Sequence, residues 1–209
     1  MRGVYITIKA KTWLKITALS GVLTPIIAFS CISLAILYYP LFSWTENALS
    51  DLGVQAGATA PLFNFGLVIS GILALIFATG LYLLQGQKVI GKFGAFTFIL
   101  ATLALVAIGI FPENIKPNHY YASVAFFALV PLSMILLTAS LLTERKVKMG
   151  LLTLLIAVVA AMPWMLYFSM HFVEGVAIPE TISAVSTSVW AIVLSFQMVK
   201  HDPIQPNNI

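Results

Sequence analysis

The sequence ITALSGVLTPIIAFSCISLAILYYPLFSWT, residues Ile16–Thr45, contains no charged side chain. A helix needs roughly 20 apolar residues to cross the hydrocarbon core of a membrane. The apolar region of a secretory signal peptide is only about 7–15 residues long. The stretch is therefore expected to form an uncleaved transmembrane helix.

The rest of the chain repeats this pattern of long apolar segments and short polar connections. Hydrophobic residues make up 60% of the sequence and charged residues 9%, against about 25% charged in a soluble domain. No segment shows the alternation of period two that marks a barrel strand. We predict an all-α, polytopic bundle of six transmembrane helices in one domain over residues 1–200, with a short tail at 201–209. The helices are expected at about 14–39, 62–84, 93–111, 120–142, 149–170 and 181–199.

The charged residues alternate along the chain in a way that predicts topology. Lysine and arginine are retained on the cytoplasmic side during insertion, so both termini are expected in the cytoplasm of a cell-membrane protein. The basic residues assigned to that side are Arg2, Lys9, Lys11, Lys15, Lys88, Lys92, Arg145, Lys146, Lys148 and Lys200. This topology accounts for the net charge of +4, and no arginine-rich patch with interleaved aromatic residues indicates nucleic acid. The basic ends are expected to attract anionic membrane lipids weakly and without specificity.

Polar residues of another kind gather at the opposite, outer ends of the predicted helices. Polar groups at this depth cost free energy unless they are paired, so they are expected to face the bundle interior and form a pocket. The members of this predicted cluster are Glu46, Asn47, Ser50, Asp51, Asn64, Glu113, Asn118, His119, His171, Glu174 and Glu180. Among them, Asn47, Asn64 and Asn118 are candidate ligand-binding residues.

Three interpretations of the cluster compete. In the first, His119, His171, Glu174 and Glu180 bind a divalent metal such as zinc, whose catalytic sites need three protein ligands and an open position. Their spacing matches no His-Glu-x-x-His motif. Cys31 is the only cysteine, so a cysteine-based zinc site is excluded.

In the second interpretation the cluster is the site of a hydrolase or transferase. Ser50, His119 or His171, and an acid supply the residue types of a catalytic triad. If the site is instead that of a metal-dependent hydrolase or transferase, Asp51 or Glu113 would act as general base. No Gly-x-Ser-x-Gly elbow is present. In the third interpretation the acids and hydroxyls cap helix ends and pack, which accounts for most residues singly.

Several motifs carry a resemblance to a known family. The runs NALSDLG at residues 47–53 and PLFNFG at residues 61–66 resemble the first outer loop and second helix of "domain of unknown function 998", an uncharacterised prokaryotic membrane family. The segment GIFPE at residues 109–113, followed by His119, and the segment IPE at residues 178–180 are similar to it as well. The resemblance covers nearly all of the chain and implies six helices. The family-like positions are Ser50, Asp51, Asn64, Glu113, His119 and Glu180.

The Ser-Asp-x-Gly turn and the six-helix plan resemble, more distantly, the DRAM/Frag/Sfk-like membrane proteins associated with autophagy and lipid distribution. Neither group supplies an established catalytic mechanism. We therefore expect a membrane protein that binds a lipid headgroup or small polar ligand in the outer pocket, or serves as an accessory subunit. A homo-oligomer or a membrane protein partner would pack through the helix faces. The alternative is a metal-dependent hydrolase or transferase acting on a lipid or lipid-linked substrate at the outer leaflet.

Overall fold

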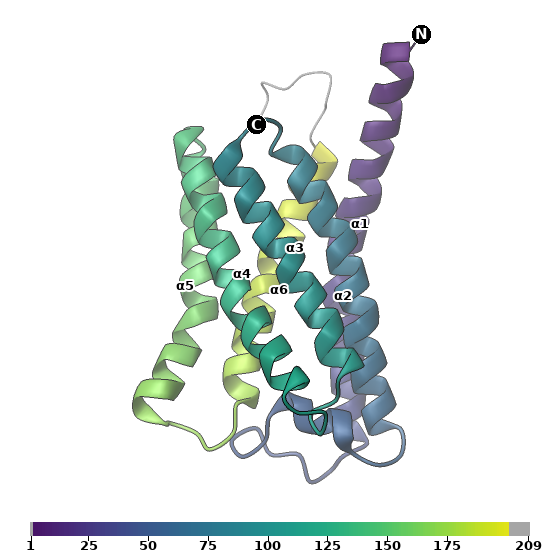
Figure 1. The fold of residues 1–209 in the computed structure, drawn as a ribbon, viewed down its shortest axis with the longest axis vertical. Coiled ribbons are helices and arrows are strands. Elements are labelled where there is room, and N and C mark those ends of the chain that lie inside the picture. The colour runs from purple at the N-terminus through teal and green to yellow at the C-terminus, as the bar shows by residue number, and fades with distance from the viewer. Residues whose placement is uncertain (1, 201–209) are drawn as a thin grey trace.

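The computed structural model describes residues 2–200, with side chains from residue 11 onward, and all secondary structure in this part of the chain is helical (Figure 1). The predicted tail at 201–209 lies outside the described residues. The elements are α1 (Arg2–Leu37), the short 3-10 helix η1 (Leu49–Val54), α2 (Thr59–Leu84), α3 (Val89–Ile110), α4 (Asn118–Thr143), α5 (Val147–Met170) and α6 (Ala177–Lys200). The predicted all-α bundle of six long helices is confirmed.

The six long helices form a closed bundle in chain order. Each helix packs against the next one along the chain, and α6 returns to pack against α1. The start of α1 and the end of α6 lie at one end of the bundle, and η1 lies at the other (Figure 1). We call the first the terminal end, which includes the connections 85–88 and 144–146. The second is the η1 end, made of residues 38–58, 111–117 and 171–176 together with the adjoining turns of α2, α4 and α6.

All six observed helices begin before the apolar segments that predicted them, while α1 and α3 end slightly earlier, at Leu37 and Ile110. For example, α1 begins at Arg2 rather than near residue 14, and α6 begins at Ala177 rather than near residue 181. The prediction was limited to the length that lies in hydrocarbon, whereas helical hydrogen bonding continues into the polar interface. Pro179 is tolerated in the first turn of α6, since an N–H at that position has no partner within the helix.

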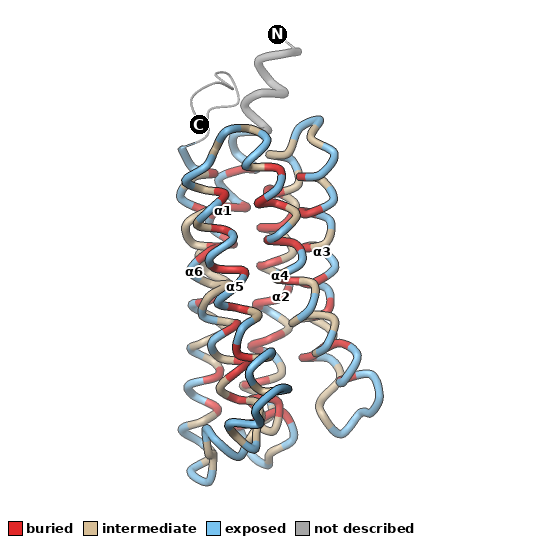
Figure 2. Tube along the Cα trace, turned by 90° about the vertical axis from the view of Figure 1, so that its left-hand side faces the viewer, coloured by how far each residue is buried: buried red, intermediate tan, exposed pale blue. Residues whose placement is uncertain are grey.

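All six helices are long and apolar enough to cross a membrane. Buried residues follow the inner sides of the helices, and exposed ones follow the outer sides (Figure 2). The outer sides carry large apolar side chains such as Phe93, Met165 and Phe168. A water-soluble protein rarely exposes so extensive an apolar surface, so this is a multi-span membrane protein.

An aromatic group fills the middle of the bundle. The rings of Phe77, Phe98 and Trp190 meet edge to face, with centroids 5.2–6.3 Å apart. Trp190 also donates from Nε1 to Thr153 Oγ1 at 3.3 Å, which satisfies its only donor. The three rings join α6 to α2 and α3, and the Trp190–Thr153 hydrogen bond joins α6 to α5.

Close packing of α2 on α3 depends on glycine. A Cβ at Gly109 would lie 2.6 Å from the Asn64 carbonyl oxygen, and one at Gly71 would lie 2.9 Å from the Val106 backbone nitrogen. Small residues at helix interfaces let backbones approach in this way. The approach brings Asn64 of α2 beside the end of α3, at the η1 end.

Candidate functional site at the η1 end

The first connection at the η1 end is held in shape by its own side chains. Asp51 Oδ2 accepts hydrogen bonds from Asn47 Nδ2 at 2.7 Å and from the Ala48 backbone N–H at 3.0 Å. The Asn47 side chain in turn accepts from the Ser43 N–H at 2.9 Å. A carboxylate that receives the N–H groups preceding a helix stabilises its start. The NALSD motif therefore specifies the short helix η1.

Three long helices or their connections hold η1 against the bundle. The Leu49 N–H donates to Glu180 Oε2 of α6 at 2.6 Å. Ser50 Oγ donates to Glu113 Oε2, in the connection between α3 and α4, at 3.4 Å. Asn64 Nδ2 of α2 donates to the Gly53 carbonyl at 2.8 Å. Residues far apart in sequence thus converge on Leu49, Ser50 and Gly53 of η1.

The third connection at this end, residues 171–176 between α5 and α6, forms backbone hydrogen bonds with the first, residues 38–58 between α1 and α2. The Gly175 N–H donates to the Thr45 carbonyl at 2.8 Å, and the Ala177 N–H donates to the Asn47 carbonyl at 2.9 Å. A Cβ at Gly175 would overlap the Asn47 carbonyl oxygen. The start of α6, and with it Glu180, is therefore placed by the first connection.

Three carboxyl groups lie close enough for their charges to repel. Burial raises the pKa of Glu113 above its ordinary 4.5, and a hydrogen bond with Asp51 and the Asp51 charge raise it further. The Ser50 hydroxyl and the Lys116 charge act in the opposite direction on that pKa. The third carboxyl, Glu180, is buried and experiences the charges of both other acids. The η1 end thus concentrates acceptors and negative charge.

A cavity of about 110 Å³ extends from η1 into the bundle. Its walls come from α1, α2, α3, α4, α6 and η1, and they are mainly apolar, with Phe29, Phe77 and Phe126 among them. Glu180 and Ser50 line the same cavity. A carboxyl group therefore borders an otherwise mostly apolar space inside a membrane protein.

The sequence profile of the family described as "Protein of unknown function (DUF998)" matches residues 22–197. The chain belongs to this family. The matched region includes η1, its anchoring residues and every cavity wall residue except Gly21. It confirms the family suggested by the NALSDLG and PLFNFG runs. No functionally curated protein is detectably similar to the chain, and no solved structure matches it.

The DUF998 chain brings together about half of the polar residues that were predicted to converge. Direct hydrogen bonds connect the first connection, η1 and their neighbours through Asn47, Ser50, Asp51, Asn64, Glu113 and Glu180. His119 is buried nearby, where its Nδ1 lies 2.7 Å from the Phe111 carbonyl oxygen.

The remaining predicted residues lie outside this network. Glu46, Asn118, His171 and Glu174 are exposed. The His171 ring packs against Tyr167, with centroids 5.7 Å apart, at the left-handed end of α5. Within the described residues, no group of three or more His, Cys, Asp and Glu side chains can hold a metal ion. The arrangement therefore gives no support to the predicted ligands His119, His171, Glu174 and Glu180 as a set.

The structure also gives no support to a serine nucleophile. The Ser50 hydroxyl donates to Glu113, and no hydrogen bond joins Ser50 to either His119 or His171 in the part of the chain described here. An activated serine needs a base within hydrogen-bond reach, usually an imidazole. The observed contact is that of a structural anchor for η1.

The sequence predicted a polar pocket at this end, but not the mainly apolar cavity that extends from it into the bundle. Apart from Ser50 and Glu180, its polar wall residues are Thr24, Thr102, Ser123, Thr187 and Ser188, which lie in mainly apolar helices. Hydroxyl groups in such helices bond to their own backbone, as Thr187 does with the Ser183 carbonyl at 2.8 Å. One signal in the sequence could have indicated this cavity. Small and polar residues follow Glu180 along one face of α6, at Ala184, Thr187, Ser188 and Ala191.

Proposed function

We propose that this DUF998 protein binds a small amphiphilic molecule at the η1 end. In this proposal an amine or hydroxyl group of the ligand donates to the Glu180 carboxyl, and its apolar part occupies the cavity. The η1 end faces the outer side of the cell membrane. The protein then acts as a binding protein or accessory subunit.

One observation carries the proposal: the Glu180 carboxyl lines a mainly apolar cavity. An ionisable group inside a membrane helix is costly and marks a binding pathway unless it serves structure alone. A carboxyl group can accept about four hydrogen bonds, and η1 supplies the one from Leu49. Acceptor capacity therefore remains for a donor in the cavity.

The charge around the cavity favours a cationic head over an anionic one. Glu113 and Asp51 lie near Glu180, while Lys116 is the one basic residue at the η1 end among the described side chains. An ammonium group would lower the repulsion among the three acids. A carboxylate or phosphate would increase it.

The size of the cavity limits the apolar part of the ligand. An engineered cavity of about 150 Å³ in another protein accommodates benzene. A cavity of about 110 Å³ therefore suits one short alkyl chain or ring. Two complete acyl chains do not fit, so a short-chain alkylamine is the appropriate probe.

Thermal unfolding in detergent tests the proposal with n-butylamine, n-butanol and butyrate as probes. We expect butylammonium to raise the Tm of the parent in a saturable way, butanol to raise it less, and butyrate to have no effect. Glu180→Gln should remove most of the butylammonium response. Glu174→Gln removes an exposed acid at the same end and should leave it unchanged.

Glu180 also anchors η1 through the Leu49 N–H, so a second variant tests the cavity without changing that hydrogen bond. Ala184→Leu adds volume to the cavity wall without altering any carboxyl group, and it should also abolish the stabilisation. A butylammonium response that persists in both Glu180→Gln and Ala184→Leu would overturn the proposal. Equal stabilisation by butyrate would overturn the proposed role of negative charge.

The proposed orientation rests on the distribution of charge over the two ends. The terminal end carries eight described basic side chains, Lys11, Lys15, Lys88, Lys92, Arg145, Lys146, Lys148 and Lys200, and one described acid, Glu144. The η1 end carries Glu46, Asp51, Glu113, Glu174 and Glu180 with a single lysine. Basic connections are retained in the cytoplasm, which supports an outward-facing η1 end.

A further inference from the structure

A second and larger pocket, independent of the proposed function, lies at the terminal end. Its volume is about 590 Å³, within the range of roughly 300–1,000 Å³ that is typical of small-molecule sites. It is bordered by the connection between α2 and α3, the connection between α4 and α5, and the last turns of α6. It thus lies at the opposite end of the molecule from Glu180.

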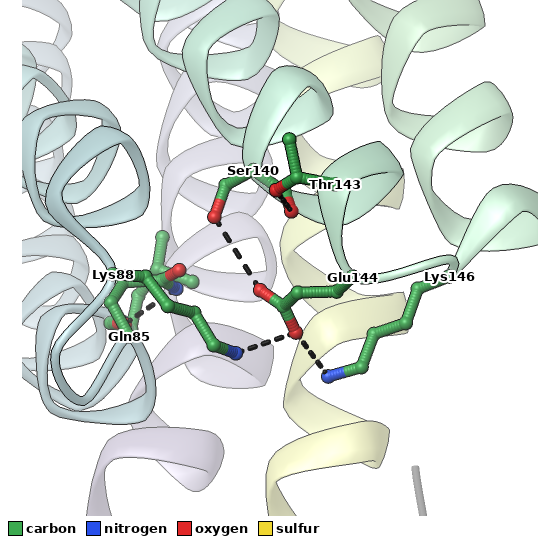
Figure 3. Close-up of polar contacts among 7 residues, drawn as sticks. Gln85, Lys88, Ser140, Thr143, Glu144 and Lys146 are labelled. Atoms are coloured by element: carbon green, nitrogen blue, oxygen red, sulfur yellow. Dashed lines mark hydrogen bonds and ion pairs between the residues drawn. The ribbon is translucent and has the colours of Figure 1, made fainter.

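The rim of this pocket holds two lysines close together. Lys88 Nζ lies 2.5 Å and Lys146 Nζ lies 2.8 Å from the same oxygen of Glu144, Oε2. The other carboxylate oxygen, Oε1, accepts from Ser140 Oγ at 3.4 Å. Figure 3 shows both ammonium groups pointing toward this one carboxylate from different connections. The two positive charges are therefore held near each other by the fold.

One carboxylate does not neutralise this rim. Glu144 supplies one negative charge for two ammonium groups, and each ammonium group has three N–H donors. The side chains of Lys88 and Lys146 are 40% and 25% exposed, so donors remain accessible from the solvent side. Arg145 and Lys148 add positive charge beside them in sequence. The rim therefore favours an anion.

The floor of the pocket is apolar. Leu81, Leu137, Leu141 and Leu194 line it, and it reaches the indole of Trp190 in the middle of the bundle. A free inorganic anion at the rim would make no contact with the leucine side chains below it. A molecule with an anionic head and an apolar chain matches both the rim and the floor.

We propose that this pocket binds the phosphate-bearing headgroup of an anionic membrane lipid, with part of its apolar chain on the leucine floor. Lys88 and Lys146 donate to the phosphate oxygens, as basic pockets between transmembrane helices do for acidic lipid headgroups. Glu144 competes with the phosphate for the two lysines, which lie near each other on two adjacent connections of the fold. The contact is specific, whereas general attraction of the basic end would involve all of its lysines alike.

Native mass spectrometry from a mild detergent tests this with phosphatidylglycerol and phosphatidylcholine as probes. We expect the parent to retain phosphatidylglycerol in preference to phosphatidylcholine. Lys88→Gln/Lys146→Gln should weaken phosphatidylglycerol binding roughly thirtyfold, from about fivefold for each lysine. Lys92→Gln/Lys148→Gln removes the same charge from residues that do not line the pocket, and it should have little effect.

Two further variants distinguish a lipid-binding site from ion pairs that only join the two connections. Glu144→Gln keeps both lysines and removes their competitor, so phosphatidylglycerol should bind more tightly even though the ion pairs are lost. Leu141→Trp keeps the rim and fills the floor, so binding should weaken. Glycerol 3-phosphate distinguishes the source of the phosphate: a lipid site is competed only weakly by this soluble head, and equal competition would overturn the role of the floor.

The contrary results are equally definite. Equal losses in the Lys88/Lys146 and Lys92/Lys148 variants would mean that the end binds anions without specificity and would overturn the proposal. Weaker binding in Glu144→Gln would also overturn it, because the carboxylate would then be supporting the lysines rather than competing for them.

Discussion

Glu113 holds its proton more tightly in the folded protein than in the unfolded chain, because burial and then Asp51 raise its pKa above 4.5. Where the folded state binds more protons, stability falls as pH rises. The contribution of Glu113 to stability is therefore greatest below about pH 4.5 and is lost as pH rises through the raised pKa. Glu113→Gln should remove this part of the pH dependence, so its Tm should gain on the parent between pH 4.5 and neutrality.

The control for this measurement is Glu174→Gln, which removes an exposed acid from the same end. Its Tm should follow the parent across the pH range. A Glu113→Gln profile parallel to that of the parent would show that the Asp51–Glu113 contact does not hold a proton. Ser50 would remain available to donate to the glutamine, so the η1 anchor is kept.

Single residues also show what could be predicted from the sequence at the site. Asn47, Ser50 and Asp51 were predicted because they form a short polar run between apolar segments, and such a run specifies local hydrogen bonds. His171 and Glu174 were predicted for the same cluster from their residue types. The left-handed residue His171 ends α5 and turns the chain, so both side chains remain exposed. Side-chain direction after such a turn is not encoded in hydropathy.

At the scale of elements, Gly175 determines how the third connection meets the first. Its N–H donates to the Thr45 carbonyl, and its lack of a Cβ leaves room for the Asn47 backbone. Gly175→Ala should destabilise the protein by about 1–3 kcal/mol, as an added methyl does in a closely packed contact. Unfolding in detergent measures this, and Val173→Ala in the same connection should change stability much less. An unaltered Tm for Gly175→Ala would mean that the two connections separate readily.

The ion pairs of Glu144 connect elements at the other end. Burial alone would raise the pKa of Glu144, but hydrogen bonds with Lys146 and Lys88 and their charges together hold it below 4.5. For a carboxyl with a lowered pKa, the stabilisation is present above pH 4.5 and is lost as pH falls through the folded value. Glu144→Gln should therefore lower the Tm at neutral pH, with a difference from the parent that shrinks in acid and in high salt. A difference independent of pH would exclude the ion pairs as its cause.

At the scale of the whole molecule, hydropathy predicted the number of long apolar helices. It succeeded because each segment must satisfy its backbone within itself in lipid, which leaves the helix as the structure for an apolar run of this length. The two pockets were not predictable in this way. Each is lined by residues from helices far apart in sequence, such as Phe29, Phe77 and Phe126 in the first. Their positions depend on helix packing, and a single sequence does not specify which faces meet.

The predicted orientation of the whole molecule has a direct test. Replacing Cys31 with alanine leaves no cysteine, so a new one at Ala56 or at Gln87 reports on one end alone. Both positions are exposed, Ala56 at the η1 end and Gln87 at the terminal end. Because basic connections remain in the cytoplasm, a membrane-impermeant maleimide should label Ala56→Cys on intact cells and Gln87→Cys only after permeabilisation. The reverse pattern would place the Glu180 cavity on the cytoplasmic side and the lysine rim outside. Mixed labelling of both positions on intact cells would show that the charge difference between the ends does not fix a single orientation.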